Sequence, residues 1–423
     1  MKAYNQSIDL KTEIIGGLTT FLAMSYIIFV NPQILSVAGM DKSALIAVTC
    51  IASAVGTLLV GFFAHSPIAM APGMGLNAFF AYSLVVGEKI PWETALGIVF
   101  LSGVLFLLLT LAGIRARLVD AIPKSLVFAI SVGIGFFITF IGLVNLGLVI
   151  KNDATLVGMG KFTPTVIIGL IGLVIMVVLE LKKIRGSLLI GIFASTAIAL
   201  ITGKIPFPEQ ILAVNINLAP IAFKLDILGA IKWSFFGAIF ALMFMDLFDS
   251  LGTLVACSHK AKLSDQKNYT GIINRLLGLD ALATMIGAVL GTSTTTAYIE
   301  SGAGIEAGGR TGVTAVVTGI LFLLGLLFVP LIGIVPNYAT APALIMVGLF
   351  MIKEIVHINF DLPEEAFPAF IIIVMIALSY SISSGLALGF ISFTLLKSLS
   401  GKIKEIKPAM WAIALLSVLF FII

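Results

Sequence analysis

The sequence predicts an all-α polytopic membrane protein with 14 membrane-spanning segments, arranged as two inverted repeats of seven. Hydrophobic residues make up 60% of the 423 residues and charged residues only 11%, whereas about 25% of the residues in an average soluble domain are charged. A compact soluble domain has too little interior to bury so much apolar surface. The apolar residues also occur in runs long enough to span a bilayer, and the two halves of the chain share short motifs.

Charged residues, glycine or proline bound each apolar run. In the first half the runs cover residues 16–38, 43–64, 66–86, 92–113, 123–150, 163–181 and 186–202. In the second half they cover 230–257, 274–291, 293–309, 311–335, 341–357, 366–383 and 384–400. A last apolar stretch, 408–423, is short for a span, so the sequence leaves open whether it crosses the bilayer or lies at its surface. No small-residue cleavage site follows the polar N-terminus, which indicates a retained first helix and not a signal peptide.

The basic residues predict the orientation. With a cytoplasmic N-terminus, 14 crossings place 18 of the 25 Lys and Arg on the cytoplasmic side and the other 7 outside, as the positive-inside rule requires. The net charge of +4 therefore reflects cytoplasmic loops and does not indicate a nucleic-acid partner. We expect a multi-pass protein of the plasma membrane, in contact with the lipid bilayer, with its N-terminus in the cytoplasm.

Matching motifs relate the two halves of the chain. Three pairs of runs begin alike and in the same order: Ile122-Pro123 with Ala341-Pro342, Thr163-Pro164 with Phe367-Pro368, and Gly186-Ser187-Leu188 with Ser384-Gly385-Leu386. Because seven is an odd number of spans, the second copy is inverted relative to the first, as in many secondary transporters. We expect the first repeat at 14–202 and the second at 230–400.

Two runs at corresponding positions cannot be regular helices. The third contains Ala71-Pro72-Gly73-Met74-Gly75, and proline and glycine break helices. The tenth contains Thr292-Ser293-Thr294-Thr295-Thr296, whose β-branched residues favour extended backbone. Extended backbone at membrane depth must be buried in protein or line a cavity. We therefore expect two short facing strands, with half-helices that restart near Asn77 and at Glu300-Ser301 and direct their N-terminal dipoles to one place. Ordinary Gly/Pro kinks are the alternative.

Acidic residues inside the apolar runs mark a candidate site. Asp246 and Asp249 are the only formal charges between Trp233 and Ser258, and their i, i+3 spacing predicts that they share one helix face. A charge at the bilayer centre costs at least about 2.5–3.5 kcal/mol, so such residues usually serve a substrate or proton pathway. Two structural acids bonded to neighbouring backbone or hydroxyl groups are the alternative. Glu300 lies at the break in the tenth run, where its carboxylate suits the adjacent N–H donors of a planar heterocycle.

These residues resemble a known family. The matching motifs are Phe21-Leu22-Ala23-Met24-Ser25-Tyr26-Ile27-Ile28-Phe29-Val30-Asn31-Pro32, Ala71-Pro72-Gly73-Met74-Gly75-Leu76-Asn77-Ala78-Phe79-Phe80, the double-Asp segment, and Gly291-Thr292-Ser293-Thr294-Thr295-Thr296 through Arg310-Thr311-Gly312. They look like the nucleobase–cation symporter-2 superfamily of xanthine and uracil permeases. More narrowly, they resemble its AzgA-like branch of adenine, guanine and hypoxanthine permeases. The resemblance covers essentially the whole chain.

The resemblance implies a fold and an activity. It implies a core domain formed by 16–113 and 230–335 and a gate domain formed by 123–202 and 341–400, which move relative to each other, often within homodimers. It implies uptake of a purine nucleobase by symport, with the proton as coupling ion and no other cofactor, no metal and no enzyme activity. Which purine is preferred stays open.

The resemblance also implies roles for individual residues. Six positions of this sequence are candidate substrate-binding residues: Tyr26, Asn77, Asp249, Thr296, Tyr298 and Glu300. Thr253 stands where uracil carriers have a histidine implicated in proton coupling, so Asp246 and Asp249 are the candidates for that role here.

Other classes of protein remain as alternatives. A carrier of the same fold for uracil or xanthine is the nearest, and a carrier of an inorganic anion is disfavoured by the three acids. An intramembrane aspartyl protease needs its two Asp on different helices, and Leu277-Gly278-Leu279-Asp280 does not complete the Gly-x-Gly-Asp motif of those enzymes. A passive channel is the third alternative.

Overall fold

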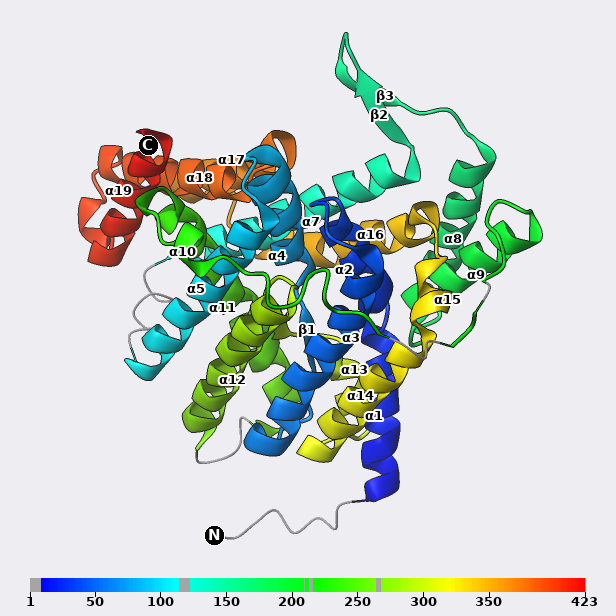
Figure 1. Cartoon of the computed structure of the whole chain (residues 1–423). Helices are drawn as coiled ribbons and strands as arrows, with labels where there is room; N and C mark the ends of the chain where they lie inside the picture. Colours follow the sequence, from blue (N-terminus) through cyan, green and yellow to red (C-terminus); the bar gives the residue numbers. More distant parts are fainter. Residues whose placement is uncertain (1–8, 114–121, 209, 213–215, 264–267, 423) are drawn as a thin grey trace.

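The computed structural model describes residues 9–113, 122–208, 210–212, 216–263 and 268–422 (Figure 1). The first half of the chain forms these helices: α1 (Leu10–Met24), α2 (Ile27–Ser36), α3 (Lys42–Leu59), α4 (Met74–Ala78), α5 (Trp92–Leu111), α7 (Lys124–Leu146), α8 (Pro164–Leu181) and α9 (Ser187–Ile201). Two π-helical turns, η1 (Val60–Ala64) and η2 (Phe79–Gly87), extend α3 and α4.

The second half forms a similar series of helices. They are α10 (Ile227–Ala230), α11 (Phe236–Lys260), α12 (Tyr269–Leu290), α13 (Ser301–Glu306), α14 (Gly312–Gly325), α15 (Val329–Gly333), α16 (Asn337–Ile352), α17 (Pro363–Ser379), α18 (Ile382–Leu399) and α19 (Pro408–Ile422). Short 3-10 segments add η3 (Trp233–Phe235), η5 (Leu326–Phe328), η6 (Lys353–His357) and η7 (Ile403–Glu405).

Each predicted apolar run contains one of these helices or a pair of them. Within the described ranges, 10 helical stretches are long and apolar enough to cross a membrane, and Met74–Gly87, Ser187–Ile201 and Pro408–Leu419 are shorter apolar helices. The mostly helical architecture with many apolar spans was therefore predicted correctly. One predicted run, 16–38, differs in detail, because a short turn at Ser25 and Tyr26 divides it into α1 and α2.

Two short strands lie at the interrupted third and tenth runs. β1 (Met70–Pro72) and β4 (Thr295–Ala297) are fully buried and pair antiparallel, with Ala71 opposite Thr296. The amide of Gly73 donates to the carbonyl of Thr294, and the amide of Tyr298 donates to that of Ala69, both at 3.0 Å. The strands thus satisfy each other's inner backbone groups, as burial at membrane depth requires.

The outer edge of each strand is capped by a threonine from a neighbouring helix. The Thr57 hydroxyl on α3 lies 3.0 Å from the amide and 2.9 Å from the carbonyl of Met70, the first residue of β1. The Thr284 hydroxyl on α12 lies 3.2 Å from both groups of Thr295, the first residue of β4. In each half of the chain, a threonine hydroxyl from a neighbouring helix therefore hydrogen-bonds to the amide and the carbonyl of the first strand residue.

The half-helix after β1 begins earlier than predicted. We expected a restart near Asn77, whereas α4 begins at Met74 with Gly73 as its N-cap in extended conformation. The reason is that Gly73 makes the last bond to the facing segment, so the next residue is free to turn into a helix. α13 begins at Ser301 with Glu300 as N-cap, as expected.

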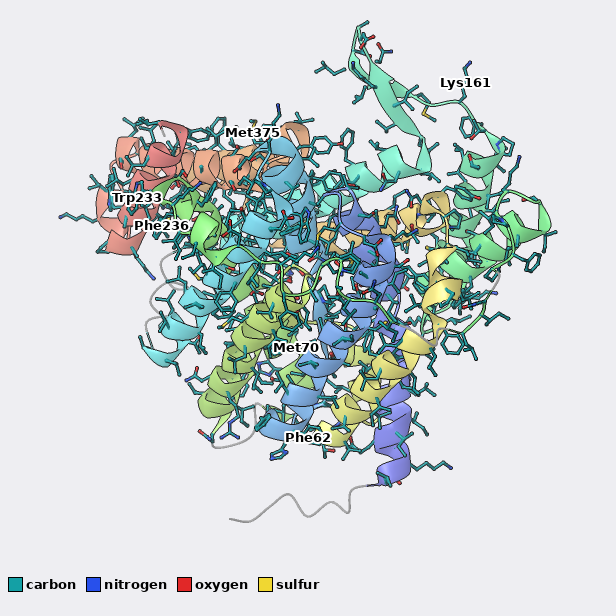
Figure 2. All side chains as sticks on the ribbon, in the orientation of Figure 1. Phe62, Met70, Lys161, Trp233, Phe236 and Met375 are labelled. Atoms are coloured by element: carbon teal, nitrogen blue, oxygen red, sulfur yellow. The ribbon has the colours of Figure 1, made fainter. Side chains whose placement is uncertain are left out.

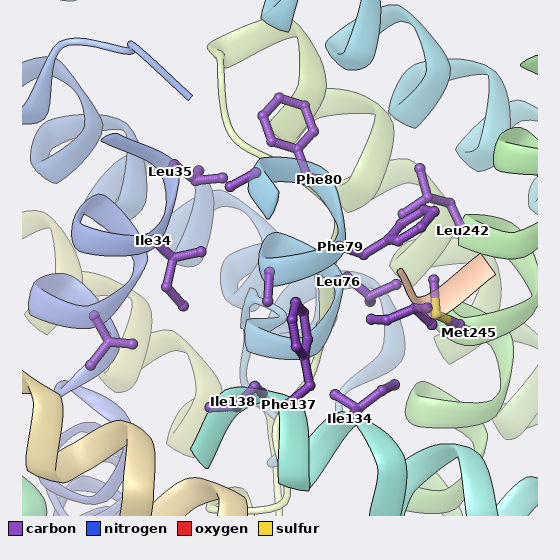
Figure 3. Close-up of a cluster of buried hydrophobic side chains, with 14 of the residues drawn as sticks. Ile34, Leu35, Leu76, Phe79, Phe80, Ile134, Phe137, Ile138, Leu242 and Met245 are labelled. Carbon is purple, nitrogen blue, oxygen red and sulfur yellow. The ribbon is translucent and has the colours of Figure 1, made fainter. Parts of the chain in front are cut away.

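The helices pack in two groups, which meet where α4 packs on α7 and where α2 packs on α16. In one group α1 and α3 pack on α14 and α5 packs on α12; in the other α7 packs on α16 and α17, and α17 on α18 (Figure 1). Figure 3 shows Leu76 and Phe79 of the third run between Ile134 and Phe137 of α7 and Leu242 of α11. The third run thus joins the two groups through an apolar cluster. The β2 (Val149–Asn152) and β3 (Leu156–Met159) hairpin projects away from the helices (Figure 1).

Close helix packing depends on small residues and on one buried acid. A Cβ at Gly17 of α1 would lie 2.6 Å from the Cβ of Val317 on α14, so these helices approach as closely as glycine allows. Next to it, the buried Glu13 carboxylate accepts the amides of Arg310 at 3.0 Å and Thr311 at 3.2 Å. A carboxylate here satisfies free amides at the start of α14 and complements its dipole.

Candidate functional site

Three interruptions of the helices meet at one place. Tyr26, in the turn between α1 and α2, donates its hydroxyl to Oε1 of Glu300 at the start of α13, at 2.6 Å. Tyr298, just after β4, donates its hydroxyl to the carbonyl of Pro72 in β1, also at 2.6 Å. Both tyrosines are buried.

Asp249 of α11 faces the same place. Its carboxylate is within hydrogen-bonding reach of the Thr296 hydroxyl on β4, and the charges of Asp249 and Glu300 both act on the Tyr26 and Tyr298 hydroxyls. Five of the six predicted substrate-binding residues therefore lie together. Asp249 is exposed, so it borders open space.

That open space continues along one face of α11. We call the residues Asp249, Gly252, Thr253, Ala256 and Lys260 the open strip; their spacing places them on one helix face, and none of them is buried. A Cβ at Gly252 would meet nothing within 4 Å, and Ile299, beside Glu300, is 53% exposed. The strip ends at Lys260, which pairs with Glu306 at 2.8 Å.

In the opposite direction the site is closed by aromatic rings. Phe248 directly precedes Asp249, and Phe244 lies one helical turn before Phe248. Phe244 is buried, and its ring centroid lies 4.5 Å from that of Phe248. It also meets the edge of Phe390 on α18, at 5.9 Å. These contacts join α11 to α18.

Polar contacts hold the two groups of helices together on that closed side. Thr340 at the start of α16 donates its hydroxyl to Oε1 of Gln33 near the end of α2, and both side chains are buried. The Nε2 of Gln33 donates to the carbonyl of Asn337 at 3.5 Å. The Ser83 hydroxyl, at the end of the third run, donates to the carbonyl of Tyr380 at 2.8 Å.

Asp246 does not share the surroundings of Asp249. The i, i+3 spacing led us to expect both carboxylates on one face, whereas Asp246 is only 1% exposed and points towards α12. There its Oδ2 accepts the Thr284 hydroxyl at 3.0 Å. Three residues turn an α-helix by about 300°, so the two side chains diverge by about 60°. Because α11 packs against α12 on one side and borders open space on the other, this divergence places Asp246 against α12 and Asp249 at the open space.

Sequence reasoning missed Asp280 as a member of the site. This residue of α12 is fully buried, its charge acts on Asp246, and it lies one turn before Thr284. Asp280 is the only acid within the run 274–291. The criterion that singled out Asp246 and Asp249, an acid inside an apolar run, was therefore sufficient to find it.

Asn77 lies in a separate buried network. Its Nδ2 donates to Oδ1 of Asn31 at 2.6 Å, and Nδ2 of Asn31 donates to the hydroxyls of Thr49 at 2.7 Å and Thr292 at 3.2 Å. Asn77 is fully buried, one turn after Gly73, whose Cβ position would contact Thr296. Its Oδ1 has no hydrogen-bond partner among the described residues. Asn77 therefore lies behind the open space and not on its surface.

The arrangement suits an uncharged ligand with N–H donors. Tyr26 occupies one oxygen of Glu300, which leaves the other oxygen and the Asp249 carboxylate as acceptors. In the described part of the chain no Lys, Arg or His forms an ion pair with either acid, and no group of three His, Cys, Asp or Glu side chains is placed to hold a metal ion.

An apolar cavity of about 290 Å³ lies apart from these residues. Its walls come from α11, α18 and α19, and Trp233 and Phe236 stack at 5.4 Å at one side of it (Figure 2). It contains none of the predicted site residues.

Comparisons with known proteins show that this chain is similar to permeases. A family model described as the Permease family matches residues 11–388. A chain of Methanocaldococcus jannaschii named as a permease is 46% identical, over 97% of this chain and 94% of its own. The adenine permease AdeP of Escherichia coli is 41% identical, over 97% and 92%. The guanine/hypoxanthine permease PbuG of Bacillus subtilis is also 41% identical, over 100% and 99%.

Solved structures share the fold at low sequence identity. The transmembrane domain of the cyanobacterial bicarbonate transporter BicA aligns with a TM-score of 0.65 at 16% identity, over 89% of this chain and 97% of that one. The murine anion transporter Slc26a9 in its inward-facing state gives 0.65 at 13% identity, over 95% and 69%. At these identities the likeness shows a shared fold.

Proposed function

This chain belongs to the nucleobase–cation symporter-2 family of permeases, and we propose that it carries purine nucleobases across the plasma membrane together with protons. The relatives named for adenine and for guanine and hypoxanthine match it over more than 90% of both chains. One observation carries the proposal within this chain: two unpaired carboxylates, Glu300 and Asp249, face the same open space beside a pair of buried strands.

Recognition of the base follows from the acceptors in the site. Tyr26 fixes the Glu300 carboxylate, so its second oxygen accepts an N–H group of the purine in a defined direction. Asp249, steadied by Thr296, accepts a second N–H group from another edge. Adenine, guanine and hypoxanthine each present at least two N–H donors in one plane. Tyr298 holds β1 against β4 behind the base.

The architecture we propose has 14 segments in two inverted repeats, with a core domain and a gate domain. The core comprises 16–113 and 230–335, and the gate comprises 123–202 and 341–400. Equivalent use of Thr57 on β1 and Thr284 on β4 supports the repeat, and the separate packing of α7, α16, α17 and α18 supports the division. By family resemblance, we also propose that two copies form a homodimer in the bilayer.

Access to the site is from the cytoplasm in this conformation. With the N-terminus inside, the C-terminal end of α11 is cytoplasmic, and the open strip runs from Asp249 to that end. The contacts of Gln33 with Thr340 and of Ser83 with Tyr380 then lie on the outer side, where they hold the core against the gate. Transport requires these outer contacts to break and the open strip to close, with a proton carried on Asp246 or Asp249.

A carrier of uracil or xanthine is the second candidate, because the same pair of acids accepts N–H groups of any planar base. A carrier of an inorganic anion fits less well, although the structural neighbours include anion transporters. An anion between Glu300 and Asp249 would be repelled, since neither acid forms an ion pair with a basic side chain in the described residues.

Uptake by cells that lack their own purine permeases tests the proposal. Cells that express this chain should accumulate labelled hypoxanthine or adenine, and cells with the empty vector should not. Unlabelled adenine, guanine and hypoxanthine should compete, while xanthine and uracil should compete weakly, and a protonophore should abolish accumulation. Strong competition by uracil or xanthine alone would support the second candidate, and accumulation unaffected by the protonophore would contradict proton symport.

A further inference from the structure

The Thr284 hydroxyl has one proton and two acceptors for it. It lies 3.0 Å from Oδ2 of Asp246 on α11 and 3.2 Å from the carbonyl oxygen of Thr295 in β4. The amide of Thr295 donates to the same hydroxyl oxygen at 3.2 Å. A hydroxyl donates one hydrogen bond and accepts two, so it cannot satisfy Asp246 and the Thr295 carbonyl together.

The equivalent threonine in the other half has no such conflict. Thr57 accepts the amide of Met70 at 3.0 Å and donates to its carbonyl at 2.9 Å, and no acidic side chain is bonded to it in the described structure. Both distances are shorter than those at Thr284, where they are 3.2 Å. The acid is thus the one element that distinguishes the cap of β4 from the cap of β1.

Asp246 is buried in a place where few groups can stabilise a negative charge. It is buried, and its Oδ1 has no hydrogen-bond partner among the described residues. The titratable groups that act on it are Asp280 from α12 and Asp249 on α11 itself, and both are acids. Two buried carboxyl groups side by side favour a shared proton over two charges. Among the described residues no basic side chain is paired with Asp246, so its charge is neutralised by a proton and not by a cation.

We propose that Thr284 is a positioning residue that transmits the protonation state of Asp246 to strand β4 of the substrate site. When Asp246 is ionised, Thr284 donates to it, and the Thr295 carbonyl loses its donor. When Asp246 is protonated, its O–H donates to the Thr284 oxygen, and the Thr284 proton turns to the Thr295 carbonyl. Every hydrogen bond is then made, and β4 is held at both backbone groups of its first residue.

This switch couples the proton to the base. Thr296, the next residue of β4, supports Asp249, and Tyr298 ties the end of β4 to Pro72 of β1. A proton on Asp246 therefore orders the side of the site that meets the substrate, and by linkage a bound purine favours the proton. This inference rests on the proposed function, because it assumes that the ligand at Asp249 and Glu300 is a purine.

Purine affinity of the purified protein across a pH series tests the switch. In the wild type, affinity should fall as pH rises, by about 5- to 150-fold for a typical coupling between sites. Thr284→Val keeps the shape and removes the hydroxyl, so its affinity should change less than twofold over the series. Thr284→Ser restores the hydroxyl and should restore the pH dependence. Thr57→Val, the matched control on β1, should weaken binding at every pH and keep the wild-type pH dependence.

The outcomes separate this inference from the proposed function. If the wild type binds no purine at any pH, the proposed function is wrong. If Thr284→Val binds purine with the same pH dependence as the wild type, only the switch is wrong. The same holds if Thr57→Val loses the pH dependence as well. Should Thr284→Val not fold, Asp246→Asn decides, because its amide donates to Thr284 at every pH. It should bind with the low-pH affinity throughout, and either wild-type pH dependence or loss of binding in this variant overturns the inference.

Discussion

Replacing Tyr26 by Phe removes one oxygen atom and leaves the buried ring in place. That oxygen donates the 2.6 Å hydrogen bond to Glu300, and a hydrogen bond to a charged group contributes about 1.5–3 kcal/mol. The bond exists before the substrate arrives, so its direct energy largely cancels between the free and bound states. What the variant loses is orientation: Glu300 becomes free to rotate, and binding must then order it at a cost of about 0.5–1.5 kcal/mol per side chain.

We therefore expect Tyr26→Phe to weaken purine binding by about two- to tenfold, since 1.4 kcal/mol corresponds to a factor of ten. Equilibrium binding of labelled hypoxanthine or adenine to purified protein measures this directly. Tyr269→Phe is the matched control, because it removes a hydroxyl that has no hydrogen-bond partner among the described residues, and its affinity should stay at the wild-type value. If Tyr26→Phe also bound within twofold of the wild type, Glu300 would not depend on Tyr26 for its orientation.

Three further predictions concern stability, access and the second acid. Glu13→Ala leaves two amides at the start of α14 without their acceptor. The Tm of this variant should fall by several degrees, while its purine affinity stays at the wild-type value. An unchanged Tm would contradict the role of Glu13. Thr253→Cys on the open strip should react with a membrane-impermeant thiol reagent in inside-out vesicles and not in intact cells, and Gln33→Leu should reduce this labelling by favouring the outward conformation. Equal labelling from both sides would contradict cytoplasmic access. Asp249→Asn should lower purine affinity by about tenfold or more, as loss of a charged acceptor implies, and an unchanged affinity would remove Asp249 from the site.

Much of the fold could be predicted because membrane helices carry strong local signals. Apolar runs bounded by charge or glycine located the helices to within several residues. The interrupted third and tenth runs were also legible, since Pro72 and Gly73 cannot continue a helix and Thr294, Thr295 and Thr296 favour extended backbone. The start of α4 at Met74 could not be predicted, because it depends on where the backbone hydrogen bonds to the facing strand end.

The side-chain partners in the site could be predicted only in part. The acids were found because a charge inside an apolar run is rare. Their partners depend on contacts between distant parts of the chain, such as Tyr26 with Glu300 and Asp246 with Thr284, and a helix period does not determine these. For the same reason Asn77 was expected on the surface of the site, whereas Asn31 holds it in a buried network.

The central claim is that Glu300, at the start of α13, recognises a purine by accepting its N–H groups. Purine affinity of Glu300→Gln tests this most directly, because the amide is the same size and replaces one acceptor by a donor. Glu306→Gln is the matched control, since Glu306 lies six residues away in an exposed pair with Lys260. We predict that Glu300→Gln loses measurable purine binding while Glu306→Gln binds as the wild type does. Wild-type affinity in Glu300→Gln would contradict the account.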